Sequence, residues 1–248
     1  MKTFFKALIF AIQFLTRIPI PVAVEPDGRI ARYGLILFPC VGWLIGGMLY
    51  SLCALMLLAG TLSPLTIAVL LVTAETLLTG AFHLDGLADT FDAFFSTAKT
   101  PEKKLEIMKD SRIGVMGAVA LMLALLVKIT LAADIVTRGH SFIILLFPVI
   151  GRWSQVALCT FSPYVRTAGI VHLFSLAGDK KTLLFASLFL APFFILPGSA
   201  ASLAGVAAFL FLYRRYVHRH IGGITGDVLG SASVLTEIIF LACACLLF

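Results

Sequence analysis

The chain has 248 residues, of which 60% are hydrophobic and only 13% are charged. A soluble domain usually carries about 25% charged residues, so this composition excludes an ordinary water-soluble fold. The formal net charge of +6 at pH 7 does not indicate a nucleic-acid-binding protein, because the basic residues are scattered among short loops and form no stripe along a helix.

Apolar segments recur along the chain and predict an all-α fold. A spanning helix needs roughly 20 mostly apolar residues, so we expect a polytopic membrane helical bundle of about seven spans, forming one integral membrane domain over residues 1–248. A further helix at Phe4–Leu15 is expected to lie in the interface or to re-enter the membrane, because Pro19 and Pro21 stop it early. The expected spans are Gly34–Leu58, Pro64–Phe82, Ile113–Ala133, Ser141–Phe161, Leu183–Leu196, Ala200–Tyr213 and Val228–Phe248.

The fifth and sixth of these segments are shorter than the others. Only Pro197, Gly198 and Ser199 separate them. The two segments therefore form either two short spans or one helical hairpin that does not reach fully across the membrane.

The basic residues predict the orientation of the bundle. If the N-terminus is cytoplasmic, the outside loops contain only Arg138, and Lys128 and Arg152 fall within spans; all other lysines and arginines then lie on the inside. This asymmetry is typical of membrane proteins, whose cytoplasmic loops carry an excess of Lys and Arg. The segments rich in carboxylates and glycines are therefore expected to face the cytoplasm.

The segment 80–92, which follows the second expected span, holds the densest group of polar residues. It contains His83 and three aspartates, Asp85, Asp89 and Asp92, whose spacing places them on one face of a helix. Carboxylates this close repel one another unless a cation lies among them. Oxygen ligands without thiolates favour Mg²⁺ or Mn²⁺, and Mg²⁺ also recruits phosphate oxygens. The segment therefore predicts a phosphate site bridged by a metal, with a solvated helix face as the structural alternative.

A second polar segment precedes the third expected span. Its cations, among them Lys109 and Arg112, are able to face metal-bound phosphates, although a membrane-surface anchor explains such lysines equally well. Asp110 and Arg112 are harder to explain as anchors. Gly114, close to a helix N-terminus, would let backbone N–H groups approach an anion.

A third segment, residues 222–231, is a glycine-rich turn that leads into the last span. Thr225 and Gly226 are candidates for cradling a phosphate, and Asp227 for a further metal ligand or a group that orients a hydroxyl. An isolated glycine-rich helix entry is weak evidence for a phosphate site. The evidence is stronger here because the expected orientation places this turn on the same side as the aspartates of segment 80–92.

Four ionisable residues fall inside expected spans: Glu75, Lys128, Arg152 and Glu237. A lone charge in hydrocarbon costs at least about 2.5 kcal/mol. Glu75 and Lys128 are therefore expected either to pair internally or to serve function, whereas Arg152 and Glu237 are candidates for extending a polar cavity from the cytoplasmic site.

Three motifs occur in the order that is typical of one enzyme family. They are His83-Leu-Asp-Gly-Leu-Ala-Asp-Thr-Phe-Asp92, Lys109-Asp-Ser-Arg-Ile-Gly114 and Gly222-Gly-Ile-Thr-Gly-Asp-Val-Leu-Gly230. With them, the chain resembles the cobalamin synthase family of adenosylcobinamide-GDP ribazoletransferases. The likeness begins near Thr16-Arg-Ile-Pro19 and extends to the final span, so it covers nearly the whole chain.

The resemblance implies a Mg²⁺-dependent enzyme, with Mn²⁺ as an alternative metal, in the bacterial inner membrane with its active site facing the cytoplasm. The implied substrates are adenosylcobinamide-GDP and α-ribazole or its 5'-phosphate, and the products are adenosylcobalamin or its 5'-phosphate and GMP. An oligomer is compatible with the resemblance. The expected metal ligands are Asp85, Asp89, Asp92 and Asp227, which together with His83 form the expected catalytic set. The expected substrate or phosphate contacts are Lys109, Asp110, Arg112, Gly114, Arg152, Thr225 and Gly226.

Two other functions compete with this one. Membrane CDP-alcohol phosphotransferases also use clustered aspartates and Mg²⁺, but they usually have an arginine soon after the aspartate-glycine pair, which this sequence lacks. A secondary transporter would bind coupling ions through its carboxylates, yet transporters tend to show internal repeats and broken helices near the midplane. The charges here concentrate at one surface, which favours the transferase.

Overall fold

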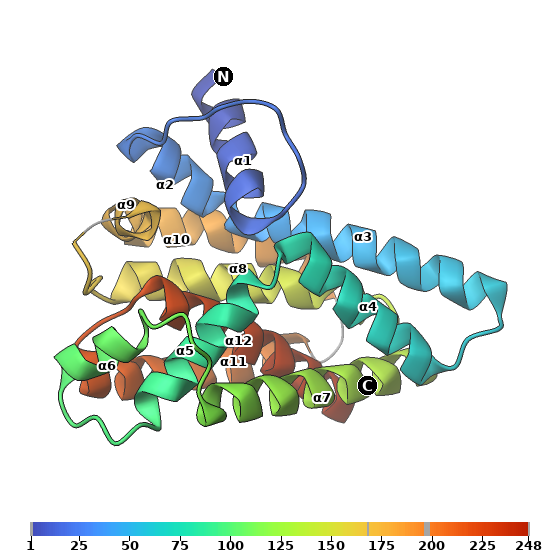
Figure 1. Ribbon diagram of the computed structural model, residues 1–248. Coiled ribbons are helices and arrows are strands. Elements are labelled where there is room, and N and C mark those ends of the chain that lie inside the picture. The colour runs from blue at the N-terminus through green and yellow to red at the C-terminus, as the bar shows by residue number, and fades with distance from the viewer. Residues whose placement is uncertain (1, 168, 196–198, 248) are drawn as a thin grey trace.

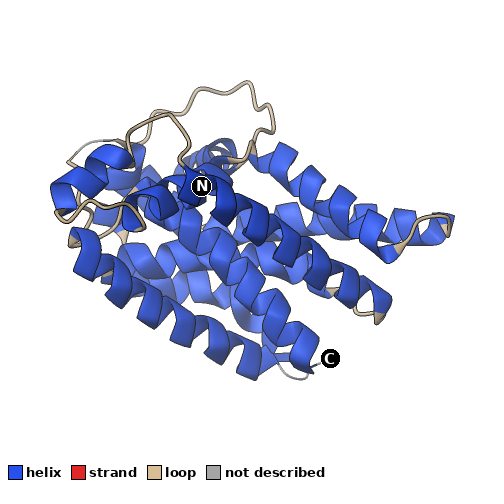
Figure 2. Ribbon diagram, turned by 60° about the horizontal axis from the view of Figure 1, so that its bottom comes forward, coloured by secondary structure: helices blue, strands red, loops and turns tan. Residues whose placement is uncertain are grey.

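The fold is all-α, as expected. The computed structural model describes residues 2–167, 169–195 and 199–247, and within these residues the only β-type pairing is an isolated bridge between Tyr164 and Ile224. Figure 2 shows the described chain as helices joined by loops. The helices are α1 (Lys2–Leu15), α2 (Gly28–Ile36), α3 (Phe38–Ala59), α4 (Pro64–Thr79), α5 (Phe82–Phe94), α6 (Pro101–Ile107), α7 (Val115–Thr137), α8 (Ile143–Phe161), α9 (Ile170–Ala177), α10 (Lys180–Ser187), the 3-10 helix η1 (Leu188–Ile195), α11 (Ser199–Ile221) and α12 (Gly226–Leu247).

The structure supports a membrane protein with five spans, or six if one bent helix pair counts as a span. Five described helices are long and apolar enough to cross a membrane: α3, α7, α8, α11 and α12. The bent pair consists of α4 and α5, whose axes differ by 91°. The expected count of seven is therefore not confirmed. Leu196, Pro197, Gly198 and Phe248, which belong to the expected spans and their connection, lie outside the described residues.

The second expected span, Pro64–Phe82, is broken before its end. Helix α4 ends at Thr79, and both Gly80 and Ala81 have left-handed backbone conformations, with φ of 63° and 59°. Gly80 adopts this conformation without steric cost, which is why glycine commonly ends a helix. The chain then turns into α5, so the aspartates lie on a separate helix and not on an extension of the span.

The fifth expected span is not one continuous α-helix in its described part. The α-helix α10 ends at Ser187, and the chain continues as the 3-10 helix η1, which contains Pro192. Proline has no backbone N–H and clashes with the preceding turn, so it disfavours a regular helix. The sixth expected span is longer than expected, since α11 extends to Ile221.

Helices α8 and α12 form the centre of the bundle. Within an apolar stretch of 18 residues, 83% of the residues of α8 and 72% of those of α12 are buried. In the other three candidate spans, the buried share of such a stretch is 33% or less. Helix α3 approaches α8 closely at Gly42, where a Cβ would lie 2.6 Å from the Cα of Val149. The missing side chain at Gly42 thus lets the two helices pack closely.

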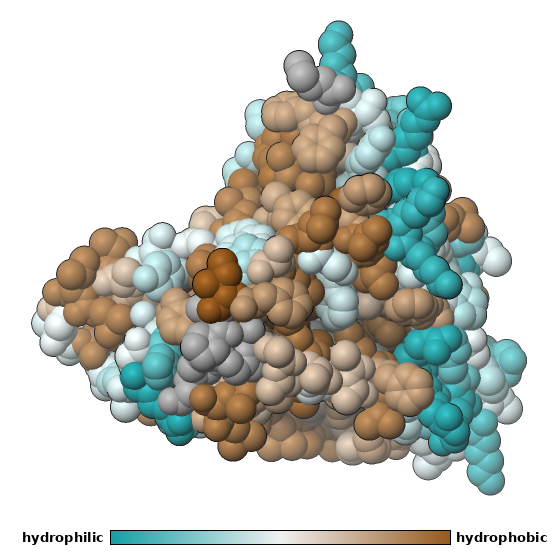
Figure 3. Space-filling view, turned by 180° about the vertical axis from the view of Figure 1, so that it is seen from behind, coloured by the Kyte–Doolittle hydropathy of each residue, from teal (hydrophilic) through white to brown (hydrophobic). Residues whose placement is uncertain are grey.

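The connections that carry polar residues gather at one end of the bundle. Helices α6 and α9 lie at this end, whereas the connection from α3 to α4 lies at the other (Figure 1). Viewed from behind, hydrophilic residues gather mainly along the same end, and hydrophobic residues cover most of the remaining face (Figure 3). The position of the N-terminus relative to the cytoplasm stays a prediction.

Candidate functional site

The candidate site forms where α5 crosses the start of α12. Two glycines allow the backbones to touch. A Cβ at Gly86 would lie 2.7 Å from the carbonyl oxygen of Asp227, and a Cβ at Gly230 would lie 3.2 Å from the Cα of His83. Both distances are too short for a larger residue without movement. The aspartate-rich segment and the glycine-rich turn therefore meet, as the sequence predicted.

This crossing concentrates negative charge. Asp85, Asp89 and Asp92 lie on α5, so the expected helical face is confirmed. Asp89 interacts electrostatically with the other two and with Asp227 on α12. Asp85 and Asp89 have no side-chain hydrogen bond or ion pair with any residue that the structure describes. Their carboxylates are therefore available to a ligand.

The cation beside this group is Arg166, which no sequence motif indicated as a site residue. Its Nη2 donates to Asp227 Oδ2 at 2.8 Å, and the hydroxyl of Thr225 donates to the same oxygen at 3.3 Å. Asp227 Oδ1 thus lacks a donor, and the buried Arg166 Nε lacks an acceptor, among the described residues.

A short backbone pairing places Arg166 there. The N–H of Ile224 donates to the carbonyl of Pro163 at 2.8 Å, and the N–H of Val165 donates to the carbonyl of Ile224 at 3.0 Å. Gly223 lies directly against Pro163, where a side chain would clash. The sequence contains no local signal for this contact, because the two loops are about 60 residues apart.

Asp92 has a role that its sequence pattern did not indicate. Its Oδ2 accepts the N–H of Gly114 and its Oδ1 accepts the N–H of Gly117, both at 2.7 Å. These donors belong to the N-terminal turn of α7, where backbone N–H groups lack partners within the helix. Asp92 therefore caps α7 and holds it against α5. The N–H of Gly114, expected to approach a phosphate, is already used by Asp92.

The other expected phosphate contacts before α7 point elsewhere. Arg112 donates from Nη2 to Asp110 Oδ2 at 2.6 Å, and its side chain is 86% exposed. Hydrogen bonds from Arg112 lower the pKa of Asp110 to about 2. Lys109 is exposed and forms no ion pair with a described residue. The structure thus pairs Arg112 with Asp110 and not with any of the four aspartates of the site.

Thr225 and Gly226 lie at the start of α12, as expected for the glycine-rich turn. The hydroxyl of Thr225 accepts the N–H of Val228 at 3.2 Å, so Thr225 caps the helix. Gly226 begins the helix one residue before Asp227. These contacts orient Asp227, and a direct contact of either residue with a phosphate stays a prediction.

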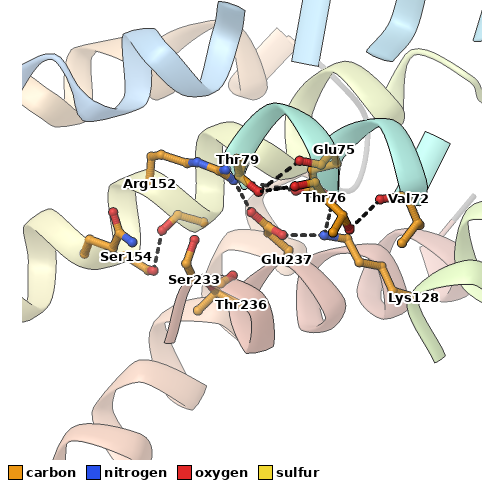
Figure 4. Close-up of polar contacts among 12 residues, drawn as sticks. Val72, Glu75, Thr76, Thr79, Lys128, Arg152, Ser154, Ser233, Thr236 and Glu237 are labelled. Carbon is orange, nitrogen blue, oxygen red and sulfur yellow. Dashed lines mark hydrogen bonds and ion pairs between the residues drawn. The ribbon is translucent and has the colours of Figure 1, made fainter. Parts of the chain in front are cut away.

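The four charged residues inside the bundle form a separate group, the ionic quartet of Glu75, Lys128, Arg152 and Glu237 (Figure 4). Lys128 Nζ donates to Glu75 Oε2 at 2.6 Å and to Glu237 Oε2 at 2.5 Å. Arg152 Nη1 donates to Glu237 Oε1 and lies 3.7 Å from Glu75 Oε1. The internal pairing of Glu75 with Lys128 is confirmed, and Arg152, expected to contact substrate, is instead held by the two glutamates.

His83 faces the quartet. Its buried side chain lines the same small cavity of about 20 Å³ as Glu75, Lys128, Arg152 and Glu237. Its Nε2 has no partner among the described residues. A proton-transfer role for His83 stays a prediction.

The donors of the site suit a hard divalent cation bound together with a substrate. Among the described residues, no three His, Cys, Asp or Glu side chains are grouped closely enough to hold a metal ion. Mg²⁺ usually binds through one or two carboxylates plus phosphate oxygens and water. The unpaired carboxylates of Asp85 and Asp89 fit this pattern, whereas four protein ligands around one ion are not assembled in this structure.

Comparisons with known proteins point to one family. Residues 7–245 match the family described as cobalamin-5-phosphate synthase. Three relatives are named adenosylcobinamide-GDP ribazoletransferase. The protein from Clostridium botulinum (strain Okra / Type B1) is 36% identical over 97% of this chain and 98% of its own length. The protein from Pseudomonas putida (strain GB-1) is 38% identical over 93% and 94%. The one from Caldanaerobacter subterraneus subsp. tengcongensis is 38% identical over 94% and 95%. No solved structure matches the chain.

Proposed function

Because this chain belongs to the cobalamin-5-phosphate synthase family, we propose that it is an adenosylcobinamide-GDP ribazoletransferase. It transfers the adenosylcobinamide phosphate moiety to α-ribazole or to α-ribazole 5'-phosphate and releases GMP. The names of the relatives support the transferase and give no support to a CDP-alcohol phosphotransferase or a secondary transporter. The observation that carries the proposal is the convergence of four carboxylates from α5 and α12 beside Arg166.

The reaction replaces one phosphorus–oxygen bond by another. The acceptor hydroxyl oxygen attacks the phosphorus attached to cobinamide, the bond to GMP breaks, and GMP leaves with the bonding electrons while the hydroxyl loses its proton. Such transfers depend mainly on positioning and on neutralising charge. Asp85 and Asp89 would hold Mg²⁺ together with the pyrophosphate. The bound ion supplies neutralisation of the phosphate and leaving-group charge.

Asp227 of α12 and Arg166, in the loop between α8 and α9, would position the reacting groups. Arg166 Nε has no partner among the described residues, and Arg166 suits a phosphate oxygen because guanidinium binds phosphate with directed hydrogen bonds. Asp227 Oδ1 would accept the hydrogen bond of the acceptor hydroxyl, since Oδ2 is already bound by Arg166 and Thr225. The two groups would thus hold the phosphate and the hydroxyl side by side.

The proposal includes the location and the orientation of the protein. The site faces the cytoplasm of a bacterial cell from its inner membrane, with the N-terminus on the cytoplasmic side. The positive-inside asymmetry supports this orientation, and so does the gathering of hydrophilic residues at the end of the bundle that carries α6 and α9 (Figures 1 and 3).

The test is a reconstituted reaction. The protein is purified in detergent and supplied with adenosylcobinamide-GDP, α-ribazole and Mg²⁺, and both cobalamin and GMP are measured. We expect equimolar formation of the two products, and loss of both when a chelator removes the divalent cation. Formation of neither product in a folded preparation, or ion-coupled uptake into vesicles without GMP release, would overturn the proposal.

A further inference from the structure

A groove outside the aspartate site has the features of a lipid-binding site. It lies between α1, α2, α10 and η1 and has a volume of about 580 Å³, within the range of roughly 300–1,000 Å³ that is typical of ligand sites. None of its lining residues belongs to α5, to α12 or to the loop that contains Arg166.

The walls of the groove are apolar and open. Phe4, Tyr33, Phe185 and Leu188 line it, and all four are exposed. In a chain with several candidate membrane spans, an exposed apolar groove of this kind suits a hydrocarbon chain, because polar ligands gain nothing from such walls.

Two cations line the same groove, Arg32 and Lys181. Arg32 donates from Nη2 to Asp179, which also caps α10 by accepting the N–H of Thr182 at 2.7 Å. Lys181 is exposed and has no carboxylate partner among the described residues. The groove therefore joins an apolar wall to an excess of positive charge.

We propose that this groove binds one anionic phospholipid, with an acyl chain along the apolar wall and the phosphate between Arg32 and Lys181. Basic pockets between the helices of membrane proteins bind anionic lipid headgroups in this way. A zwitterionic lipid fits less well, because its ammonium group would add positive charge next to the two cations. The expected orientation places both cations on the cytoplasmic side, where headgroup phosphates lie within their reach.

The chain provides a matched pair of lysines for the test. Lys180 and Lys181 are neighbours on α10 and both are exposed, but only Lys181 lines the groove. Native mass spectrometry of the full chain in detergent would measure the binding of phosphatidylglycerol and phosphatidylcholine to the wild-type protein and to the variants Lys181→Gln and Lys180→Gln.

We expect one phosphatidylglycerol to bind the wild-type chain more tightly than phosphatidylcholine does. Lys181→Gln should weaken the binding of phosphatidylglycerol about fivefold, as expected for one basic residue near a lipid phosphate, and Lys180→Gln should leave it unchanged. Arg32→Gln should weaken it further than Lys181→Gln does, because the unpaired carboxylate of Asp179 would then face the phosphate.

Three results would overturn the proposal. The first is equal binding of the two lipids by the wild-type protein. The second is the same loss of phosphatidylglycerol in both lysine variants. The third is unchanged binding of phosphatidylglycerol in Lys181→Gln accompanied by weaker binding of adenosylcobinamide-GDP, which would assign the groove to a substrate. Measured unfolding temperatures of all variants establish that any loss of lipid does not come from unfolding.

Discussion

Two groups of carboxylates in this molecule differ in how their charge is balanced. In the ionic quartet, Glu75 and Glu237 face Lys128 and Arg152, and all four side chains are buried. At the aspartate site, four carboxylates share one close cation among the described residues, Arg166. The quartet is neutral within the protein, whereas the site retains an excess of negative charge.

This difference in charge balance indicates that the quartet stabilises the fold, whereas the aspartate site suits a ligand. A buried ion pair is stable only when both partners are present, because removing one leaves an uncompensated charge. The quartet satisfies this condition by itself and connects α4, α7, α8 and α12. The aspartate site lacks such a balance among the described residues, and the proposed Mg²⁺ would supply it. Carboxylates therefore connect the helices of the bundle in the quartet, whereas at the aspartate site we propose that they bind a ligand.

The largest expected effect is on the quartet. Glu237→Gln would leave Lys128 and Arg152 with a single carboxylate, and we expect the free energy of unfolding to fall by about 3–5 kcal/mol. The double variant Glu237→Gln/Lys128→Gln restores neutrality and should be more stable than the single variant. Unfolding temperatures in one detergent measure both. If the single variant were as stable as the wild type, the charge balance of the quartet would not contribute to the stability of the bundle.

Asp89→Asn should reduce activity without reducing stability. Removing one of several repelling carboxylates should not lower the unfolding temperature, but GMP release at saturating substrate should fall at least about 100-fold, which corresponds to about 2.7 kcal/mol. Added Mg²⁺ should raise the unfolding temperature of the wild-type protein more than that of the variant, because a ligand stabilises only the state that binds it. A variant that loses stability and keeps its activity would place Asp89 with the quartet instead.

The close crossing of α5 and α12 gives an intermediate effect. At Gly86→Ala the new methyl group meets the backbone of Asp227, and overpacking of this kind typically costs about 1–3 kcal/mol. Activity should fall with stability because the aspartates are displaced. The matched control is Gly47→Ala in α3, where a Cβ meets no atom within 4 Å. Equal rates of product formation in the two variants would contradict the proposed geometry.

We expect the smallest effect on activity from a change in the exposed pair of Asp110 and Arg112. The pKa of Asp110 lies at about 2, below its ordinary value of 3.8, because Arg112 donates hydrogen bonds to it. A lowered carboxyl pKa stabilises the fold above the ordinary value, and the contribution disappears as the pH falls through about 2. Asp110→Asn should therefore leave the pH profile of activity between pH 5 and 9 unchanged. A shift of that profile would connect Asp110 to the reaction.

The features of the site that follow from local spacing could be predicted from the sequence. The separation of Asp85, Asp89 and Asp92 fixes one helical face, and the distribution of basic residues predicted that α5 and the turn before α12 share one end of the bundle. The break after Thr79 was missed because a glycine inside an apolar run does not by itself show where a helix ends.

Contacts between distant segments could not be predicted in the same way. Arg152 and Glu237 are 85 residues apart, and their pairing depends on how α8 and α12 pack. Arg166 reaches Asp227 through a backbone pairing that has no local sequence pattern. Asp92 resembled its neighbours in the sequence, yet only the position of α7 shows that its oxygens cap a helix.

The most direct test of the central claim is the binding of a divalent cation together with the substrate. Electron paramagnetic resonance would measure the affinity for Mn²⁺ in the presence of adenosylcobinamide-GDP for the wild-type protein, Asp89→Asn and Asp110→Asn. We expect Asp89→Asn to weaken the binding of Mn²⁺ at least tenfold, about 1.4 kcal/mol, and Asp110→Asn to leave it unchanged. Unchanged affinity in Asp89→Asn would contradict the claim that the carboxylates of α5 hold the metal and the pyrophosphate.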